Sequence, residues 1–270
     1  MIEFDAVSKH YPGGSLAVKN FSLTIPSHKT VVLLGSSGSG KTTLLRMINR
    51  MVDPSSGRVL IDDEDIAQRD PVQLRRSIGY VLQEGGLLPH RTVLDNIATV
   101  PRLLGTPKDE ALSTAKRLLE QLGLSQDFGN RYPKQLSGGQ QQRVGVARAL
   151  ASDPNILLMD EPFGAVDPIV RRELQDLLLN LQKELGKTLV FVTHDIDEAF
   201  RLGDQVVVLE EHAVIAQQGS PADIMSAPAN DFVKNFIGDN RGDRILSTKQ
   251  HLGRTITIDR DGRTIGVIQE

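Results

Sequence analysis

The sequence contains no cysteine and no tryptophan, and only 4% of its residues are aromatic. Without cysteine the chain can form neither disulfides nor thiolate metal sites, a composition that fits a cytosolic protein. The formal net charge is −3 and the pI is near 6.1. Because this balance provides no electrostatic basis for binding nucleic acid, we expect no nucleic-acid partner.

Long apolar runs are also missing from the sequence. No stretch approaches the roughly 18 apolar residues that cross a bilayer, so we do not expect the chain to be a channel by itself. The first five residues, MIEFD, lack the basic start and the apolar stretch of a secretion signal. With 270 residues the chain can still bury a full core, in one large domain or two small ones.

A glycine-rich segment lies between a predicted strand and a predicted helix. Gly35 to Thr43 reads GSSGSGKTT and matches the pattern G-x-x-x-x-G-K-[ST]. The apolar run at 30–34 predicts a buried parallel strand, and residues 43–49 predict a helix. Amide groups of such a loop bind phosphate, with Lys41 at the β- and γ-phosphates and the Thr42 hydroxyl on Mg²⁺. The alternative, a chance glycine-rich turn, does not explain the flanking strand and helix.

Polar residues follow three further predicted strands. Asp160 and Glu161 end the apolar run that starts at Ile156, His194 follows 188–193, and Gln83 follows 78–82. Ligands of parallel α/β sheets bind at the carboxyl ends of the strands. Asp160 suits the Mg²⁺ shell and Glu161 is a candidate base for water. Taken alone, Gln83 could be an ordinary polar residue, and a lone histidine is usually structural.

The remaining patterns predict the domain organisation. Residues 1–34 alternate polar and apolar, which favours a small antiparallel sheet that leads into the first core strand. Residues 84–151 predict a mostly helical insertion between two core strands. One helical face there is apolar: Ala111, Leu112, Ala115, Leu118, Leu119 and Leu122.

Two local signals are ambiguous on their own. Ser137-Gly138-Gly139 at a predicted helix start could be a second anion site or an ordinary glycine-containing cap. Tyr11 could stack on a base, although a loop tyrosine without that role is the simpler interpretation.

The C-terminal third predicts a hairpin at 206–216, then one helix from Ser220 to about Ile237. A second hairpin is predicted around Asp261-Gly262. We therefore expect one domain at 1–240 and a short extension at 241–270, either natural or part of a truncated regulatory region.

Taken together, these motifs resemble ATP-binding cassette (ABC) transporter ATPases, in the order that the family has them and from about Met1 to Gly238. The resemblance implies an α/β fold: a P-loop NTPase (RecA-like) core with a mostly parallel sheet, an N-terminal antiparallel β-subdomain and an inserted α-helical subdomain. The segment resembling Walker A is Gly35, Ser36, Ser37, Gly38, Ser39, Gly40, Lys41, Thr42 and Thr43. The segment resembling the signature motif is Leu136, Ser137, Gly138, Gly139 and Gln140.

The other motifs of this family also have counterparts. Gln83 is similar to the Q-loop glutamine, Ile156 to Glu161 to Walker B, and His194 to the switch histidine. Asp167 is similar to the D-loop aspartate, although valine precedes it where leucine is commoner. By the same resemblance Tyr11 becomes the adenine-stacking aromatic.

The resemblance implies a mechanism, cofactors and partners. Two copies would meet head to tail in an ATP-dependent dimer, with Asp167 at the interface and each signature motif completing the other copy's ATP site. Thr42, Asp160 and Gln83 would surround Mg²⁺, while Glu161 and His194 act on water and the γ-phosphate. Transmembrane permease subunits would bind near Gln83 to His90. The chain would lie peripherally on the cytoplasmic face of the cell membrane, with a solute-binding protein as an indirect partner.

Two stretches are similar to importers of quaternary-amine osmoprotectants such as glycine betaine, carnitine and choline. They are MINRMVDPSSGRVLIDDEDI at 47–66 and GLLPHRTVLDNIATVPRLLG at 86–105. Alternatives are an import ATPase for another small solute, such as an amino acid or phosphonate, a soluble ABC ATPase of translation or DNA repair, and a regulator that does not hydrolyse ATP. The second cassette or long coiled coil typical of the soluble class is missing.

Overall fold

The computed structural model describes residues 1–270 except 84–85, 165, 239–246, 252–253, 259–263 and 268–270. The chain divides into two compact units, Met1–Pro221 and Ala222–Glu270. The sequence patterns placed a domain limit at residue 240 instead, and that limit remains a prediction.

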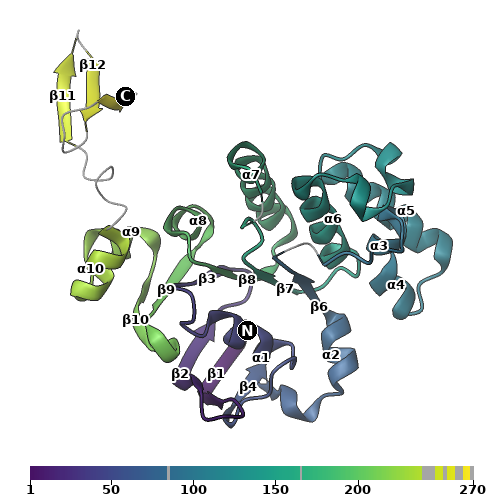
Figure 1. The fold of residues 1–270 in the computed structure, drawn as a ribbon, viewed down its shortest axis with the longest axis horizontal. Coiled ribbons are helices and arrows are strands. Elements are labelled where there is room, and N and C mark those ends of the chain that lie inside the picture. Colours follow the sequence, from purple (N-terminus) through teal and green to yellow (C-terminus); the bar gives the residue numbers. More distant parts are fainter. Residues whose placement is uncertain (84–85, 165, 239–246, 252–253, 259–263, 268–270) are drawn as a thin grey trace. The chain divides into compact units, whose positions relative to one another are not determined.

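A six-stranded sheet forms the centre of the first unit (Figure 1). Its strand order is β10-β9-β3-β8-β7-β6, and every neighbouring pair is parallel except β10 with β9. The strands are β3 (Thr30–Gly35), β6 (Ile78–Val81), β7 (Ile156–Asp160), β8 (Thr188–Thr193), β9 (Gln205–Leu209) and β10 (Ile215–Gly219). All residues of β3, β7 and β8 are buried, which explains why these strands are nearly continuous apolar runs.

A smaller antiparallel sheet packs through helix α1 (Lys41–Ile48) against one face of this core. Its order is β2-β1-β4-β5. The strands are β1 (Ile2–His10), β2 (Leu16–Ile25), β4 (Ser56–Ile61) and β5 (Glu64–Asp65). The rings of Phe4 and Phe21 meet edge to face at 5.2 Å inside it. The predicted N-terminal sheet therefore exists, and β4 and β5 extend it beyond residue 34.

The predicted insertion is mostly helical. It contains α3 (Val93–Ile97), α4 (Thr99–Leu103), α5 (Lys108–Gln121), α6 (Gly138–Leu150) and the short 3₁₀ helices η2 (Gln126–Asn130) and η3 (Pro133–Gln135). Four positions of the predicted apolar face of α5 are buried: Ala111, Ala115, Leu118 and Leu119. Two core strands flank the insertion, as predicted, and they also pair with each other in parallel, with Ile78 opposite Ile156.

Five further elements complete this unit: η1 (Ile66–Gln68), α2 (Pro71–Ser77), η4 (Glu211–Ala213), α7 (Pro168–Leu185) and α8 (Ile196–Leu202). Helices α7 and α8 cover the face of the sheet opposite α1 (Figure 1). The predicted P-loop NTPase fold is thus confirmed.

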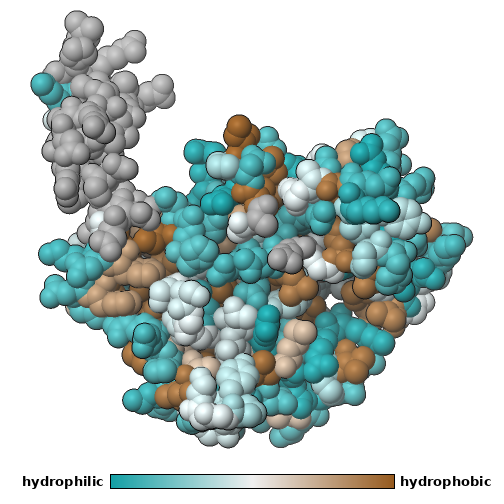
Figure 2. Space-filling model, in the orientation of Figure 1, coloured by the Kyte–Doolittle hydropathy of each residue, from teal (hydrophilic) through white to brown (hydrophobic). Residues whose placement is uncertain are grey.

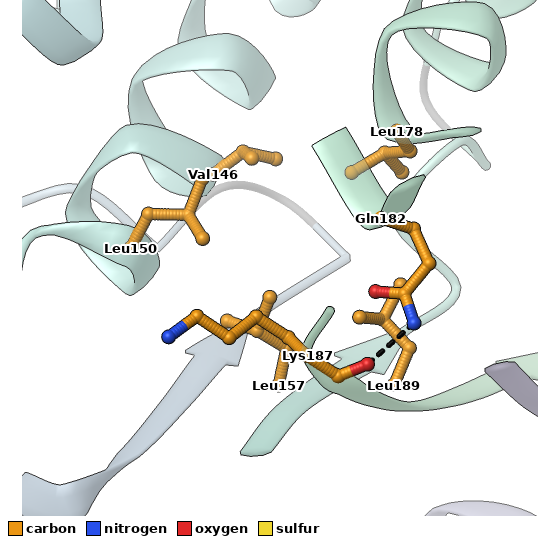
Figure 3. Close-up of a pocket in the computed structure, with 7 residues that line it drawn as sticks. All are labelled: Val146, Leu150, Leu157, Leu178, Gln182, Lys187 and Leu189. Carbon is orange, nitrogen blue, oxygen red and sulfur yellow. Dashed lines mark hydrogen bonds between the residues drawn. The ribbon is translucent and has the colours of Figure 1, made fainter. Parts of the chain in front are cut away.

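A small gap separates α6 and α7 from strands β7 and β8. It is lined mainly by Val146, Leu150, Leu157, Leu178 and Leu189 (Figure 3). Its volume of about 10 Å³ leaves room for at most about one water molecule. The Gln182 amide at its rim donates to the Lys187 carbonyl. This gap is a packing feature of the core and is too small for a ligand.

The second unit corrects one prediction. The single helix expected from Ser220 to Ile237 is wrong, because the chain forms α9 (Pro221–Ser226) and α10 (Asp231–Gly238). Pro228 lies between them, where it has no amide donor and disfavours helical geometry in the residue before it.

A three-stranded antiparallel sheet follows, made of β11 (Ser247–His251), β12 (Arg254–Ile258) and β13 (Thr264–Val267). Strands β12 and β13 confirm the predicted hairpin pairing, whereas Asp261 and Gly262 lie outside the described residues.

Hydrophobic residues on the visible surface form small separate patches on a mostly hydrophilic face (Figure 2). Within the described ranges, none of the helices combines the length and apolar character needed to cross a bilayer.

Leu158 is 0% exposed at the centre of β7, so truncating its side chain should strongly destabilise the fold. We expect Leu158→Ala to lower the free energy of unfolding by about 2–5 kcal/mol, because the substitution leaves a cavity between packed layers. Ile169→Ala is the control, since Ile169 is 75% exposed and its loss should cost at most about 0.5 kcal/mol. Urea denaturation measures both, and equal losses would contradict this assignment of the core.

Candidate active site

The predicted phosphate-binding loop connects the end of β3 to the first residue of α1. Lys41 is 4% exposed, and its ammonium donates to the carbonyls of Gly35 at 2.8 Å and Ser36 at 2.6 Å. Burial lowers the pKa of Lys41, and the nearby charges of Glu161 and Asp160 act in the opposite direction. The loop thus encloses the ammonium group of Lys41, near the carboxylates of Asp160 and Glu161.

Two neighbouring segments hold this loop in shape. Gly40 has a φ of 95°, and a Cβ there would lie 2.6 Å from the Ala17 carbonyl and 3.2 Å from the Ala213 Cβ. Ala213 N–H also donates to the Ser39 carbonyl at 2.8 Å. The turn before β10 and strand β2 therefore leave no room for a side chain at position 40.

Asp160 is the point at which α1, β6 and β7 meet. Thr42 Oγ1 donates to its Oδ1 at 2.9 Å, and Tyr80 OH donates to its Oδ2 at 3.3 Å. The Arg46 guanidinium lies 3.8 Å from the same Oδ2. Burial raises the pKa of the Tyr80 phenol, so Tyr80 acts as a neutral donor near neutral pH. The carboxylate therefore faces the threonine of the phosphate loop.

Glu161 leaves the sheet directly after β7. Its backbone has a φ of 45°, an uncommon conformation for a residue with a side chain, and its N–H donates to the Val192 carbonyl at 3.0 Å. This conformation places Oε2 at 3.2 Å from Nδ1 of His194, which follows β8. The two predicted residues from separate strand ends are thus in direct contact.

Gln83 and Tyr11 lie at the edges of this cluster. The Gln83 side chain is close to Gly164, since a Cβ at position 164 would lie 3.3 Å from its amide nitrogen. Tyr11 is 38% exposed, and its hydroxyl lies 3.5 Å from Thr43 Oγ1. The Lys9 ammonium lies 5.4 Å from the centre of the Tyr11 ring. Tyr11 therefore presents an accessible ring beside the phosphate loop.

The segment Leu136 to Gln140 lies elsewhere. Ser137 caps α6, accepting the N–H of Gln140 at 3.3 Å, while the Gln140 side chain accepts the N–H of Ser137 at 3.0 Å. Gly139 packs on α7, because a Cβ there would lie 2.4 Å from Val170 Cγ1. Asp167 caps α7 by accepting the N–H groups of Ile169 and Val170. Helices α6 and α1 lie on opposite sides of the sheet (Figure 1), so one chain does not bring Ser137 to its own Lys41.

A wide groove of about 640 Å³ lies at the other end of the sheet. It is lined partly by α2 and by residues 152–155, and Ser77 and Asn155 directly precede strands β6 and β7. The groove is thus at the amino ends of the strands, away from the carboxyl ends that carry Asp160 and Gln83.

Comparison with known proteins decides the family. The family model described as ABC transporter matches residues 18–164. The carnitine transport ATP-binding protein OpuCA of Listeria monocytogenes is 50% identical over 241 residues, which cover 89% of this chain and 60% of that protein. The chain belongs to the ABC transporter family. The family resemblance predicted from the motifs is confirmed.

Other ABC relatives agree. The glycine betaine/carnitine/choline transport ATP-binding protein OpuCA of Bacillus subtilis is also 50% identical, over 89% of this chain and 63% of that protein. The glycine betaine uptake system ATP-binding protein YehX of Escherichia coli is 48% identical, over 92% of this chain and 80% of its own length. This ABC chain therefore spans about three fifths of the length of the two OpuCA proteins.

Solved ABC structures share the fold. The dimeric ATP-binding cassette MJ0796, bound to ADP and Pi, has a TM-score of 0.74 and 36% identity, covering 82% of this chain and 99% of that one. The cbiO1 protein of Clostridium perfringens, part of the ABC transporter complex cbiONQ, has a TM-score of 0.77 and 29% identity, covering 90% and 98%.

Sequence reasoning missed Arg46 and Tyr80 in this ABC site. A signal for Arg46 was available, because Thr42 and Arg46 are four residues apart and therefore share one face of α1. Tyr80 offered no such signal, since its contact with Asp160 depends on the pairing of β6 with β7.

The phosphate loop generates a paired prediction for this ABC chain. Gly38 and Gly40 both have left-handed backbones, but a Cβ at Gly38 would meet nothing within 4 Å. We expect Gly40→Ala to lower the free energy of unfolding by about 1–3 kcal/mol more than Gly38→Ala, because only Gly40 is enclosed. Thermal unfolding of both variants without nucleotide measures the difference, and equal losses would show that enclosure at Gly40 has no cost.

Proposed function

We propose that this chain is the ATP-hydrolysing subunit of an ABC importer for a quaternary-amine osmoprotectant. The observation that carries the enzymatic part is the convergence of five side chains at the carboxyl end of the core sheet. They come from three segments distant in sequence: Lys41, Thr42, Asp160, Glu161 and His194. This is the arrangement that phosphoryl transfer requires, since such catalysis depends on positioning and charge stabilisation.

The phosphates of ATP would bind to the amides of residues 35–43, with Lys41 exchanging its carbonyl contacts for the β- and γ-phosphates. The head of α1 adds its partial positive charge at the same place. Tyr11 would stack on the adenine, where its ring is accessible beside Thr43.

The donor set fits Mg²⁺. The Thr42 hydroxyl and the Asp160 carboxylate lie 2.9 Å apart, and the Gln83 amide oxygen is a third donor of the same kind. Mg²⁺ prefers oxygen ligands and usually takes only one or two carboxylates from the protein. When bound, the ion neutralises charge on the phosphates. Thr42, Asp160 and Gln83 are therefore the residues that would hold it.

Glu161 and His194 would act on the reacting groups. The Glu161 carboxylate would orient and polarise the attacking water, and His194 would contact the γ-phosphate as charge develops. Their contact at 3.2 Å supports this pairing, because each limits the positions open to the other.

We propose that a second copy of the chain completes each nucleotide site. Helix α6 has exposed Ser137 at its head, and one chain does not bring that head to its own phosphate loop. A head-to-tail dimer would let Ser137, Gly138 and Gly139 of the second chain bind the γ-phosphate, with Asp167 at the interface. The dimeric state of the MJ0796 cassette supports this assembly.

The names of the relatives support the solute class and a role in transport. They describe transport of carnitine, glycine betaine and choline. We therefore place the chain on the cytoplasmic face of the membrane, bound to permease subunits near Gln83 to His90 and served by a solute-binding protein. Residues 1–240 would form the cassette, with 241–270 as an extension.

Removing the charge of Glu161 tests the enzymatic proposal. Because general-base assistance contributes about 10²- to 10⁴-fold, we expect Glu161→Gln to lower kcat by that range while ATP still binds. Phosphate release measures the rate, and size-exclusion chromatography with ATP should show the variant accumulating as a dimer. Glu173→Gln, at an exposed acid on α7, is the control. An unchanged rate in Glu161→Gln would reject the role of Glu161.

The solute class has its own test. We expect the ATPase of a membrane complex isolated through a tag on this chain to rise when its solute-binding protein is loaded with glycine betaine, carnitine or choline. Stimulation by an amino acid or a phosphonate instead would leave the ATPase proposal intact and reject the solute class.

A further inference from the structure

Glu198 is a buried carboxyl group that has no part in the proposed nucleotide site. It is 5% exposed, and Thr193 Oγ1 donates to its Oε2 at 2.7 Å. The same hydroxyl accepts the N–H of Asp195 at 3.0 Å. Because Thr193 and Asp195 are the two neighbours of His194 in the chain, Glu198 restrains the backbone on both sides of this histidine.

Arg171 extends this network to α7. Its NH1 lies 3.5 Å from Asp195 Oδ2 and 3.8 Å from Glu198 Oε1. Its NH2 donates to the Val166 carbonyl at 3.4 Å. Val166 directly precedes Asp167, the cap of α7. One guanidinium therefore joins the carboxylates of Asp195 and Glu198, next to His194, to the turn that starts α7.

Such a network is costly to maintain. A buried carboxyl group loses hydration, and burial raises the pKa of Glu198. Glu198 is buried, but Arg171 is 31% exposed and lies 3.8 Å from it, and ion pairs with an exposed partner contribute little stability. The network therefore fixes the geometry around His194 more than it stabilises the fold.

We propose that Glu198 and Arg171 are positioning residues that hold His194 against Glu161 and link this pair to the turn around Val166 and Asp167. The inference rests on the proposed ATPase function.

The alternative is that Arg171 only links α7 to α8 and has no effect on His194. The chain contains a matched control for this alternative. Arg201 on α8 donates to Asp176 on α7 at 2.5 Å, so it joins the same helices as Arg171 does. Both arginine side chains are 31% exposed, and both have a buried Nε without a partner among the described residues. Of the two arginines, only Arg171 contacts Asp195, the residue after His194, and Glu198.

The first experiment compares Arg171→Leu with Arg201→Leu. We expect kcat for ATP hydrolysis to fall by about ten- to a hundredfold in Arg171→Leu, since a displaced catalytic group can cost about 10²-fold. The KM for ATP should change little, because the phosphate loop is untouched. Arg201→Leu should keep the kcat of the unaltered chain, while urea denaturation reports the stability of both. Equal kcat losses in the two variants would overturn the proposal.

The second experiment places Glu198→Gln in two backgrounds. Glutamine still accepts the Thr193 hydrogen bond but offers Arg171 no charge. If Glu198 acts through His194, Glu198→Gln should lower kcat in the unaltered chain and have no further effect on the residual rate of His194→Ala. Additive losses would contradict this route. A chain that hydrolyses ATP yet is insensitive to Arg171→Leu rejects only this inference, whereas an unaltered chain without ATPase rejects the proposed function.

Discussion

The hydrogen bond from Thr42 to Asp160 connects the head of α1 to the end of β7, and the site is arranged around it. It can form because β3 and β7 lie in one parallel sheet, with only β8 between them. Parallel strands end at the same edge, so the phosphate loop after β3 and the carboxylates after β7 must meet there. The buried apolar strands thereby determine where polar chemistry can occur.

The surroundings of this bond restrain it from several sides. Tyr80 and Arg46 contact Asp160, and Ala213 restrains the loop through Ser39. Glu161 turns out of the sheet in a left-handed conformation that brings it to His194. These groups come from α1, β6, the ends of β7 and β8 and the turn before β10, so the site depends on the way these elements pack together.

The sequence predicted most of this arrangement from strand ends. Apolar runs located β3, β7 and β8, and the residues at or directly after the ends of β7 and β8 then identified Asp160, Glu161 and His194. Contacts between strands could not be predicted in the same way. The Tyr80 contact depends on the register of β6 with β7, and the Arg171 network depends on how α7 lies against α8. The break at Pro228 was a local signal that the helix pattern around it concealed.

The central claim is that one chain supplies half of each site, and mixing two inactive chains tests it most directly. Lys41→Ala disables the phosphate loop, and Ser137→Arg blocks the head of α6. If the site is shared between two copies, an equal mixture contains mixed dimers with one intact site, and ATPase activity returns to about a quarter of the unaltered rate or less. This estimate assumes random pairing and independent sites. If each chain carries its own complete site, Ser137→Arg keeps its activity alone, because Ser137 lies away from its own Lys41, and mixing restores nothing; that result would contradict the account.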